Sequence, residues 1–414
     1  MKILVLNAGS SSQKSCLYDL TGDPSQNSPQ PIWEAAVDWT QHQGFAAVKI
    51  KTLQGEFKQE IQTTDRTQVL THLLDSLHQG ETQAIAALSA IDIVGHRVVH
   101  GGAHYTESVR ITPAVKQTIA DLAILAPNHN PAHLEGIEAI EKILPTVPQV
   151  AVFDTAFHAT LSPVAFTYPI PQELTQQGIR RYGFHGISHQ YCAHRATEIL
   201  GACASSNDDR DLTSFATSPK LITCHLGNGC SLAAIQNGQS IDTTMGFTPL
   251  DGLMMGTRSG AIDPAILLHL QRQEHYTVEQ LDTLLNKESG LKGVSGVSAD
   301  MRQVTEAMAA NPQAQLAFDL FIHRLRSGIG SMLASLQGVD ALVFTGGIGE
   351  NSAIVREQAC VAFKFLRLEL DQDKNHQRPV NQDIATPDSS VRVLVIHTEE
   401  DWAIALECWK IQAS

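Results

Sequence analysis

Residues 2–20 read KILVLNAGSSSQKSCLYDL, and this stretch decides the fold. The apolar run at 2–6 predicts a buried strand, the small residues at 7–12 predict a turn, and residues 15–20 predict a returning strand. Residues 221–235, LITCHLGNGCSLAAI, repeat the order of apolar strand, glycine turn and apolar strand. A hairpin that recurs in both halves predicts two related α/β domains facing a cleft.

The length of the chain also favours two domains, since 414 residues exceed what one hydrophobic core usually holds. We expect an N-terminal lobe at residues 1–153 that is completed by a return of residues 394–414. A nucleotide-binding C-terminal lobe is expected at residues 154–393.

Strands and helices are expected between and after the hairpins. Thr112-Pro113 and Asn130-Pro131 are typical of helix starts, with a capping residue followed by proline at the first position. The expected strands are 91–99, 149–153, 341–344 and 391–396, and the expected helices are 112–126, 130–144, 318–336 and 402–409.

Composition limits the partners. The formal net charge of -14 argues against a nucleic acid or an anionic membrane as a standing partner. No apolar run approaches the roughly 20 residues of a membrane span, and too few apolar residues precede Asn7 for a signal peptide. The seven cysteines form no CxxC pair, which predicts reduced thiols and a cytoplasmic location over a zinc site or disulfide framework.

Three strand-to-turn junctions carry small residues, at 7–12, 227–231 and 346–351. Glycine there permits close approach, and turn N–H groups can converge on a phosphate. The chain has no GxxxxGK[ST] motif and no proper GxGxxG context, which excludes a P-loop or Rossmann site. Each junction alone is more simply a tight turn, whereas three together favour a nucleotide site. Lys14 is either a phosphate contact or a solvated strand residue.

A second set consists of polar residues that stand close to glycines: Arg97, Arg258 and His185. Any one of them alone indicates a surface loop or a structural salt bridge. Together they suit a reaction in which a carboxylate attacks ATP, because guanidinium groups bind both carboxylate and phosphoryl oxygens. Fixed donors and Mg²⁺ would then offset the charge on the transferring phosphoryl group.

Asp154 follows the expected strand at 149–153. A carboxylate at a strand end is typical of a metal ligand or an orienting group, and a helix N-cap is the alternative. A small carboxylic acid is already ionised at neutral pH, so the reaction requires no general base. Metal binding or positioning is therefore favoured over proton abstraction.

Eight motifs, in order along nearly the whole chain, resemble those of the acetate kinase family. They are NAGSSS at 7–12, HRVVHGG at 96–102, FDTAFH at 153–158, RYGFHG at 181–186, HLGNG at 225–229, TMGFTPL at 244–250, GLMMGTRSG at 252–260 and FTGGIGEN at 344–351. The resemblance implies two duplicated actin-like, ribonuclease H-like α/β lobes around a central cleft, usually in a homodimer. It implies reversible, direct in-line transfer of the ATP γ-phosphate to acetate, giving acetyl phosphate and ADP.

The resemblance also implies roles for residues. Arg97 would bind the substrate carboxylate, Arg258 and His185 would stabilise the transition state, and Asp154 would be the catalytic carboxylate. Asn7 and Glu400 would hold Mg²⁺, with Mn²⁺ as the alternative metal. The acyl pocket would be walled by Val99, Phe184 and Pro249. The ATP site would be lined by Lys14, His225, Leu226, Gly227, Asn228, Gly229, Asp300, Met301, Arg302, Gly347, Ile348, Gly349, Glu350 and Asn351.

Four positions depart from the family pattern. Asn128 stands where the family usually has Leu, which would make the acyl pocket more polar. Ala261 replaces an acidic residue, which would loosen the support around Arg258. The acidic run at 398–401 leaves Glu399 as an alternative metal ligand to Glu400. The polar segment at 203–219 is expected to be a peripheral loop.

Two other functions remain open from the sequence. A propionate or butyrate kinase of the same fold would differ by one or two methylenes, and each is worth only about 1–3 kcal/mol of discrimination. A nucleotide-switched binding protein would need the phosphate turns but not the arginine and histidine set. The presence of that set favours the kinase.

Overall fold

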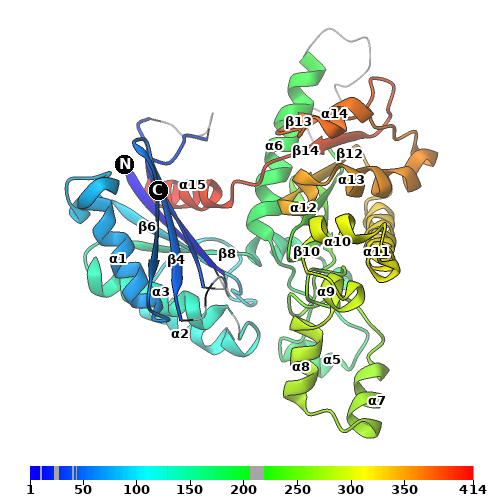
Figure 1. Ribbon diagram of the computed structural model, residues 1–414, viewed down its shortest axis with the longest axis horizontal. Coiled ribbons are helices and arrows are strands. Elements are labelled where there is room, and N and C mark those ends of the chain that lie inside the picture. The colour runs from blue at the N-terminus through cyan, green and yellow to red at the C-terminus, as the bar shows by residue number, and fades with distance from the viewer. Residues whose placement is uncertain are drawn as a thin grey trace. The chain divides into compact units, whose positions relative to one another are not determined.

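The computed structural model of the protein describes residues 1–9, 12–22, 28–39, 42, 44–127, 129–205 and 219–413 (Figure 1). The chain divides into two compact units. The first comprises Met1–Ala156 and Glu399–Ser414, and the second comprises Phe157–Thr398.

The boundaries of these units differ from the expected 153/154 and 393/394. Asp154 belongs to the first unit, where its backbone N–H donates to the carbonyl of Val98. The strand Arg392–Val395 (β14) belongs to the second unit, because it pairs in parallel with the strand Ala341–Thr345 (β12). The return to the first unit therefore starts at Glu399, after this strand has ended.

The described part of the first unit contains an eight-stranded mixed sheet in the order β5-β4-β3-β2-β1-β6-β8-β7. The first five strands form an antiparallel meander, and β1, β6 and β8 run parallel to one another. The bounds are β1 Lys2–Ala8, β2 Ser12–Asp19, β3 Trp33–Asp38, β4 Ala46–Thr52, β5 Gly55–Ile61, β6 Ile93–Val98, β7 Val109–Arg110 and β8 Gln149–Phe153.

Four α-helices accompany this sheet: α1 Arg66–His78, α2 Pro113–Asp121, α3 Asn130–Ile143 and α15 Glu400–Ala413. Leucines of α1 and Ile140 of α3 join strand residues such as Leu4 and Val94 in one buried cluster. Figure 1 shows α15, drawn in red, lying against the blue N-terminal strands, and it contacts β1 and β6. A Cβ added at Gly95 of β6 would lie 2.5 Å from Cys408 Sγ, so glycine permits this close packing.

The described part of the second unit contains a six-stranded mixed sheet in the order β11-β10-β9-β12-β14-β13. Three antiparallel strands are followed by strands parallel to β9, as in the first unit. The order β11-β10-β9-β12-β14 thus repeats β3-β2-β1-β6-β8, which confirms the predicted duplication. The bounds are β9 Leu221–Leu226, β10 Cys230–Gln236, β11 Gln239–Thr243, β12 Ala341–Thr345, β13 Gln382–Asp383 and β14 Arg392–Val395.

The α-helices of the second unit are α4 Pro163–Phe166, α5 Gln172–Gln176, α6 Gly186–Ser205, α7 Ala265–Gln273, α8 Val278–Lys287, α9 Gly290–Ser295, α10 Met301–Ala307, α11 Pro312–Leu336, α12 Gly346–Asn351, α13 Ala353–Cys360 and α14 Gln372–His376. The longest, α11, packs on β9, β10 and β11. The Asn311 side chain caps its N-terminus, and Gln337 ends it in the left-handed conformation.

Most predicted elements are confirmed. The first hairpin pairs Asn7 with Lys14, and the Thr112 hydroxyl accepts from the Val115 N–H as a helix cap. Four predictions were wrong. Residues 346–351 form the short helix α12 and not an open turn, and residues 203–205 continue α6. The helix α2 ends at Asp121 and not at 126, and Asn130 is the first residue of α3 and does not cap it. The rest of the predicted 203–219 loop, from 206 to 218, lies outside the described residues.

Candidate active site

In the first unit, two nitrogens of the Arg97 guanidinium donate to the carboxylate of Asp154. Arg97 Nη2 lies 2.7 Å and Nε lies 3.1 Å from Asp154 Oδ2. The pair forms because β6 and β8 are adjacent parallel strands that end at the same edge of the sheet. Burial raises the pKa of the Asp154 carboxyl, and the facing guanidinium opposes that shift. These contacts assign Asp154 to holding Arg97 and not to capping a helix.

Asn7, at the end of the neighbouring strand β1, connects Arg97 to the acidic start of α15. Its Oδ1 accepts from Arg97 Nη1 at 3.2 Å, and its Nδ2 donates to Asp401 Oδ1 at 2.8 Å and to Glu400 Oε2 at 3.5 Å. Glu400 Oε2 also lies 3.7 Å from Arg97 Nη1. Burial raises the pKa of the Asp401 carboxyl, and the Asn7 amide opposes it. Asn7, Glu400 and Arg97 therefore lie together, as the sequence predicted, and Asp401 joins them.

The amide oxygen of Asn7 and the carboxylate oxygens of Glu400 and Asp401 are of the kind that suits a hard cation such as Mg²⁺. Mg²⁺ in kinases is usually held by one or two carboxylates, water and substrate phosphates, not by a closed protein cage. Within the described ranges, no group of three or more His, Cys, Asp or Glu side chains forms a ready metal site. Glu400 and Asn7 offer oxygens of this kind, but here the Asn7 oxygen accepts from Arg97 and the Asn7 amide nitrogen faces Glu400.

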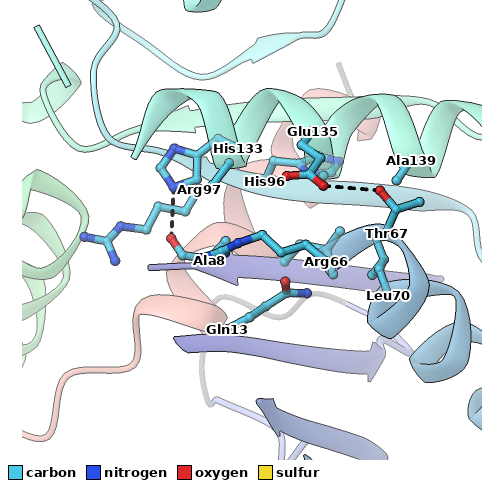
Figure 2. Close-up of a pocket in the computed structure, with 13 residues that line it drawn as sticks. Ala8, Gln13, Arg66, Thr67, Leu70, His96, Arg97, His133, Glu135 and Ala139 are labelled. Carbon is cyan, nitrogen blue, oxygen red and sulfur yellow. Dashed lines mark hydrogen bonds between the residues drawn. The ribbon is translucent and has the colours of Figure 1, made fainter. Parts of the chain in front are cut away.

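His133 of α3 braces the same edge of the sheet from behind (Figure 2). Its Nδ1 accepts from the Val99 N–H at 3.4 Å, so Nε2 carries the proton and donates to the Ala8 carbonyl at 2.9 Å. Burial lowers the pKa of His133 to about 3, which keeps the ring neutral. A cavity of about 20 Å³ lies beside this contact and holds about one water molecule, so it is no substrate pocket. The imidazole thus joins the strand ends that carry Asn7 and Arg97.

In the second unit, His185 stands immediately before α6 in a left-handed backbone conformation, with φ of 56°. This conformation is uncommon for residues other than glycine, although Asn, Asp and His adopt it more often than most, and it occurs often at functional sites. The preceding carbonyl, of Phe184, accepts from His158 Nε2 at 3.1 Å. Phe184 itself is buried. The turn at 183–186 is therefore fixed from the interior.

The side chains of His185, His225 and Arg258 gather around Gly229. The rings of His185 and His225 stack with centroids 4.2 Å apart. A Cβ added at Gly229 would lie 3.2 Å from His185 Nε2 and 3.5 Å from Arg258 Nη2, so only glycine leaves this space. Arg258 Nη1 donates to the Pro249 carbonyl at 2.7 Å. Two predicted catalytic residues, His185 and Arg258, are thus neighbours of His225 and Gly229, which were predicted for the ATP site.

A pocket of about 1030 Å³ in the second unit collects the predicted nucleotide segments. Its lining includes Gly227, Asn228, Asp300, Met301, Arg302, Gly347, Ile348 and Asn351. Asp300 caps the N-terminus of α10 and pairs with Arg302, so its carboxylate shapes the wall. Pockets of roughly 300–1,000 Å³ hold small-molecule ligands and cofactors, and this one has room for a nucleotide.

Not every residue expected at the ATP site lines this pocket. Lys14, an exposed residue of β2 opposite Asn7, belongs to the first unit, and its phosphate contact stays a prediction. Leu226 is buried in the core, because side chains alternate along a strand and that of Leu226 points into the interior. His225 and Gly229 belong to the cluster around His185.

The carboxylate of Glu350 also points away from the pocket. Its Oε1 accepts from the Gly346 N–H at 2.9 Å and the Thr398 N–H at 3.2 Å, and its Oε2 lies 2.6 Å from His397 Nδ1. Gly349 is buried, and its carbonyl accepts from Arg356. Glu350 therefore stabilises the segment at 346–351 and does not line the pocket.

Two of the positions that depart from the family pattern are Ala261 and Asn128. Ala261 is exposed, and its N–H donates to the Gly252 carbonyl, so the backbone contact next to Arg258 is kept without an acidic side chain. Asn128 lies outside the described residues. The predicted acyl wall divides between Val99 of the first unit and Phe184 and Pro249 of the second.

Residues 2–406 match the family model described as the acetokinase family. The chain belongs to the acetokinase family. A relative from a Nostoc species named acetate kinase is 62% identical over 414 residues, covering 99% of each chain. The Porphyromonas gingivalis acetate kinase structure matches with a TM-score of 0.86 at 38% identity, covering 99% of each chain. A Francisella tularensis propionate kinase structure also gives 0.86, at 37% identity and 99% coverage of each.

Sequence reasoning missed several residues of this acetokinase's site. Asp401 stood beside Glu400 in the sequence, but nothing local showed that it would face Asn7. The nucleotide pocket is also lined by Ser352, Ala353, Ile354, His376 and Arg378.

Within the described ranges, no helix of this acetokinase combines the length and apolar character needed to cross a bilayer. Six described cysteines are buried thiols outside any disulfide. Burial raises the pKa of the Cys230 and Cys360 thiols to about 12. They act as small apolar core residues and not as nucleophiles.

Proposed function

We propose that this acetokinase transfers the γ-phosphate of ATP directly to the carboxylate of acetate, reversibly, giving acetyl phosphate and ADP. The observation that carries the proposal is the 62% identity, over nearly the whole chain, to a protein named acetate kinase. The pocket of about 1030 Å³ supports it, because separate glycine-containing segments supply backbone at its wall.

Arg97 binds the acetate carboxylate in this proposal. A guanidinium presents several donors, so it can keep Asp154 on one edge and accept a second carboxylate on another. Asp154 acts by fixing the guanidinium plane. Acetate arrives ionised, so no residue needs to remove a proton from it.

Arg258 and His185 stabilise the transferring phosphoryl group. The reaction brings two anions together, and donors that are already in place lower the barrier most where charge is spread over the phosphoryl oxygens. The Pro249 carbonyl and the left-handed turn at 183–186 hold the two side chains in place.

Asn7 and Glu400 would hold Mg²⁺, with Mn²⁺ as a substitute. Bound there, the cation would neutralise charge on the ATP phosphates. Asp401 accepts from the Asn7 amide nitrogen, and the Asn7 carbonyl oxygen accepts from Arg97, so Mg²⁺ would have to take this oxygen from the guanidinium.

The nearest alternative substrate is propionate, with butyrate next. It is favoured by one observation, the equal TM-scores of the acetate kinase and propionate kinase structures. The test compares kcat/KM for acetate, propionate and butyrate with hydroxylamine trapping of the acyl phosphate. We expect acetate to give the highest value, and a higher value for propionate would overturn the acetate assignment.

The alternative of another class is a nucleotide-switched binding protein. It would bind ATP in the same pocket without repeated transfer to a carboxylate. Many turnovers of acetate-dependent acyl phosphate formation per protein chain would exclude it. A single turnover of bound ATP, unaffected by acetate, would favour it.

We also propose that the protein works as a homodimer in the cytoplasm. None of the described residues of α7 is buried. Its apolar residues Ile266 and Leu268 are therefore exposed to solvent, by 46% and 48%. Tyr276 and Val278, which follow α7 in the chain, are also exposed apolar residues. Such a patch on a helix is typical of a subunit interface, and a second copy of the chain is the occupant that family membership suggests.

A further inference from the structure

Four side chains form a hydrogen-bonded line that leads from the interior of the second unit to His185. His185 Nδ1 lies 2.9 Å from Ser231 Oγ, and Ser231 Oγ lies 2.8 Å from His189 Nε2. His189 Nδ1 lies 2.7 Å from Thr223 Oγ1, whose hydroxyl reaches the Ala233 carbonyl at 3.5 Å. Ser231, His189 and Thr223 are completely buried, so water does not compete for these contacts.

The secondary structure sets this line. His185 and His189 are one helical turn apart at the start of α6, where side chains four residues apart share a face. Thr223 and Ser231 lie on the paired strands β9 and β10 and point to the same side of the sheet. The helix and the hairpin together place two imidazoles and two hydroxyls in alternation.

Only one direction of donation uses every contact in the line. The single Thr223 hydroxyl proton goes to the Ala233 carbonyl, so Thr223 Oγ1 accepts from His189 Nδ1. Burial keeps His189 neutral, so its Nε2 accepts from the Ser231 hydroxyl. Ser231 Oγ then accepts from His185 Nδ1. The reverse direction would leave the contact to Ala233 unmade.

We propose that Thr223, His189 and Ser231 are positioning residues that keep the proton of neutral His185 on Nδ1. This inference rests on the proposed role of His185 in the reaction. His185 then becomes an imidazolium by gaining one proton at Nε2, while every proton in the buried line stays in place. The cationic ring can donate from Nε2 to a phosphoryl oxygen, with its plane already fixed through Nδ1.

The surroundings of His185 contain other groups that carry or can gain charge. His225 of β9 stacks on the ring, Arg258 lies across Gly229, and His189 lies along the line. An arriving phosphate would bring negative charge beside Nε2, and the position of the fixed proton decides which nitrogen responds.

The first experiment reads the tautomer directly by ¹⁵N NMR. The intact protein is labelled with ¹⁵N-histidine and studied at pH 8 without nucleotide, with His185→Gln used to assign the signals. We expect a protonated, pyrrole-type Nδ1 and an unprotonated, pyridine-type Nε2. The opposite pattern would overturn the proposal. This readout needs no turnover, so it stands or fails separately from the proposed function.

The second experiment compares Thr223→Val with Thr223→Ser. Valine removes the hydroxyl with little change in volume, so His189 Nδ1 loses its acceptor and the line reverses. We expect Thr223→Val to move the His185 proton to Nε2 and to lower kcat about tenfold, with each KM changed less than twofold. Thr223→Ser should keep the wild-type tautomer and kcat. An unchanged tautomer in Thr223→Val would overturn the proposal, and the wild-type spectrum decides it if that variant does not fold.

Discussion

Arg97 Nη2 and Asp154 Oδ2 lie 2.7 Å apart at the end of two parallel strands, with only 2% of the Asp154 side chain exposed. Removing the guanidinium from a buried carboxylate destabilises the fold, because the remaining charge is uncompensated. The same two residues that we assign to substrate binding therefore also matter for the stability of the first unit. Activity and stability have to be measured together for any variant of either residue.

We expect Arg97→Ala to abolish measurable acyl phosphate formation and to lower the free energy of unfolding by about 3–5 kcal/mol. The physical reason is the uncompensated Asp154 carboxylate that remains in the interior. Urea unfolding of Arg97→Ala, Asp154→Ala and the double variant measures the coupling. Single-variant effects that simply add, within about 0.5 kcal/mol, would show that the ion pair does not couple the two sites.

Arg258→Ala should lower kcat about 10²–10³-fold, because it removes one fixed donor from the developing phosphoryl charge. The guanidinium also holds the Pro249 carbonyl, so thermal unfolding shows whether any of the loss comes from stability. Hydroxamate assays and thermal unfolding provide the two measurements. Arg324→Ala, at an exposed position of α11, serves as the matched control and should match the wild type. A normal rate in Arg258→Ala would reject its role.

The protein should lose stability as pH falls from about 6.5 toward 4. Burial lowers the pKa of His96 and His158 to about 4 and that of His133 to about 3. Above pH 6.5 these rings are neutral in both states, so they add no pH dependence. Below it the unfolded chain binds protons that the folded chain refuses, at about 1.4 kcal/mol per pH unit for each histidine.

Urea unfolding at pH 7.5, 6.0 and 5.0 measures this slope. His96→Gln removes one buried imidazole and should make the slope shallower by about one proton. His323→Gln changes an exposed histidine of α11 and should leave the slope as in the wild type. Equal slopes in all three proteins would mean that His96 does not contribute.

Glu350→Gln should raise the KM for ATP several-fold with a smaller change in the KM for acetate. A charged acceptor bonded to the Gly346 and Thr398 N–H groups is stronger than a neutral amide, by roughly twofold. Its loss loosens the start of α12, whose residues Gly347 and Ile348 line the nucleotide pocket. Nucleotide titration by calorimetry gives the affinity, with the exposed Glu369→Gln as the control. Unchanged ATP affinity would refute this bracing role.

If the proposed dimer forms through α7, Ile266→Asp combined with Leu268→Asp should yield a monomer. Two charges in the apolar surface of α7 would have to be desolvated on association, which costs several kcal/mol. Sedimentation equilibrium measures the mass of the assembly. A dimer that persists at micromolar concentration would place the interface elsewhere, and Gln271→Asp on the same helix provides a control for added charge alone.

Local sequence patterns were enough for much of the fold. Apolar runs broken by glycine predicted both hairpins, and a capping residue before proline predicted the start of α2. These signals work because strand alternation and helix capping depend on neighbours in the chain. The short helix α12 was missed because Gly346-Gly347 reads as a turn, whereas Glu350 and Thr398 hold it in helical form.

The sequence likewise predicted only some features of the candidate site. The sequence by itself determined which residue types were available: the arginines, His185, the strand-end Asp154 and the small residues that leave room for phosphate. Only the tertiary structure decided that His133 joins Ala8 to Val99, that Asp401 holds Asn7, and that Glu350 turns away from the nucleotide pocket. Chain neighbours fix backbone conformation, but the partner of a buried polar side chain is fixed by strand register and helix packing between residues up to 394 positions apart.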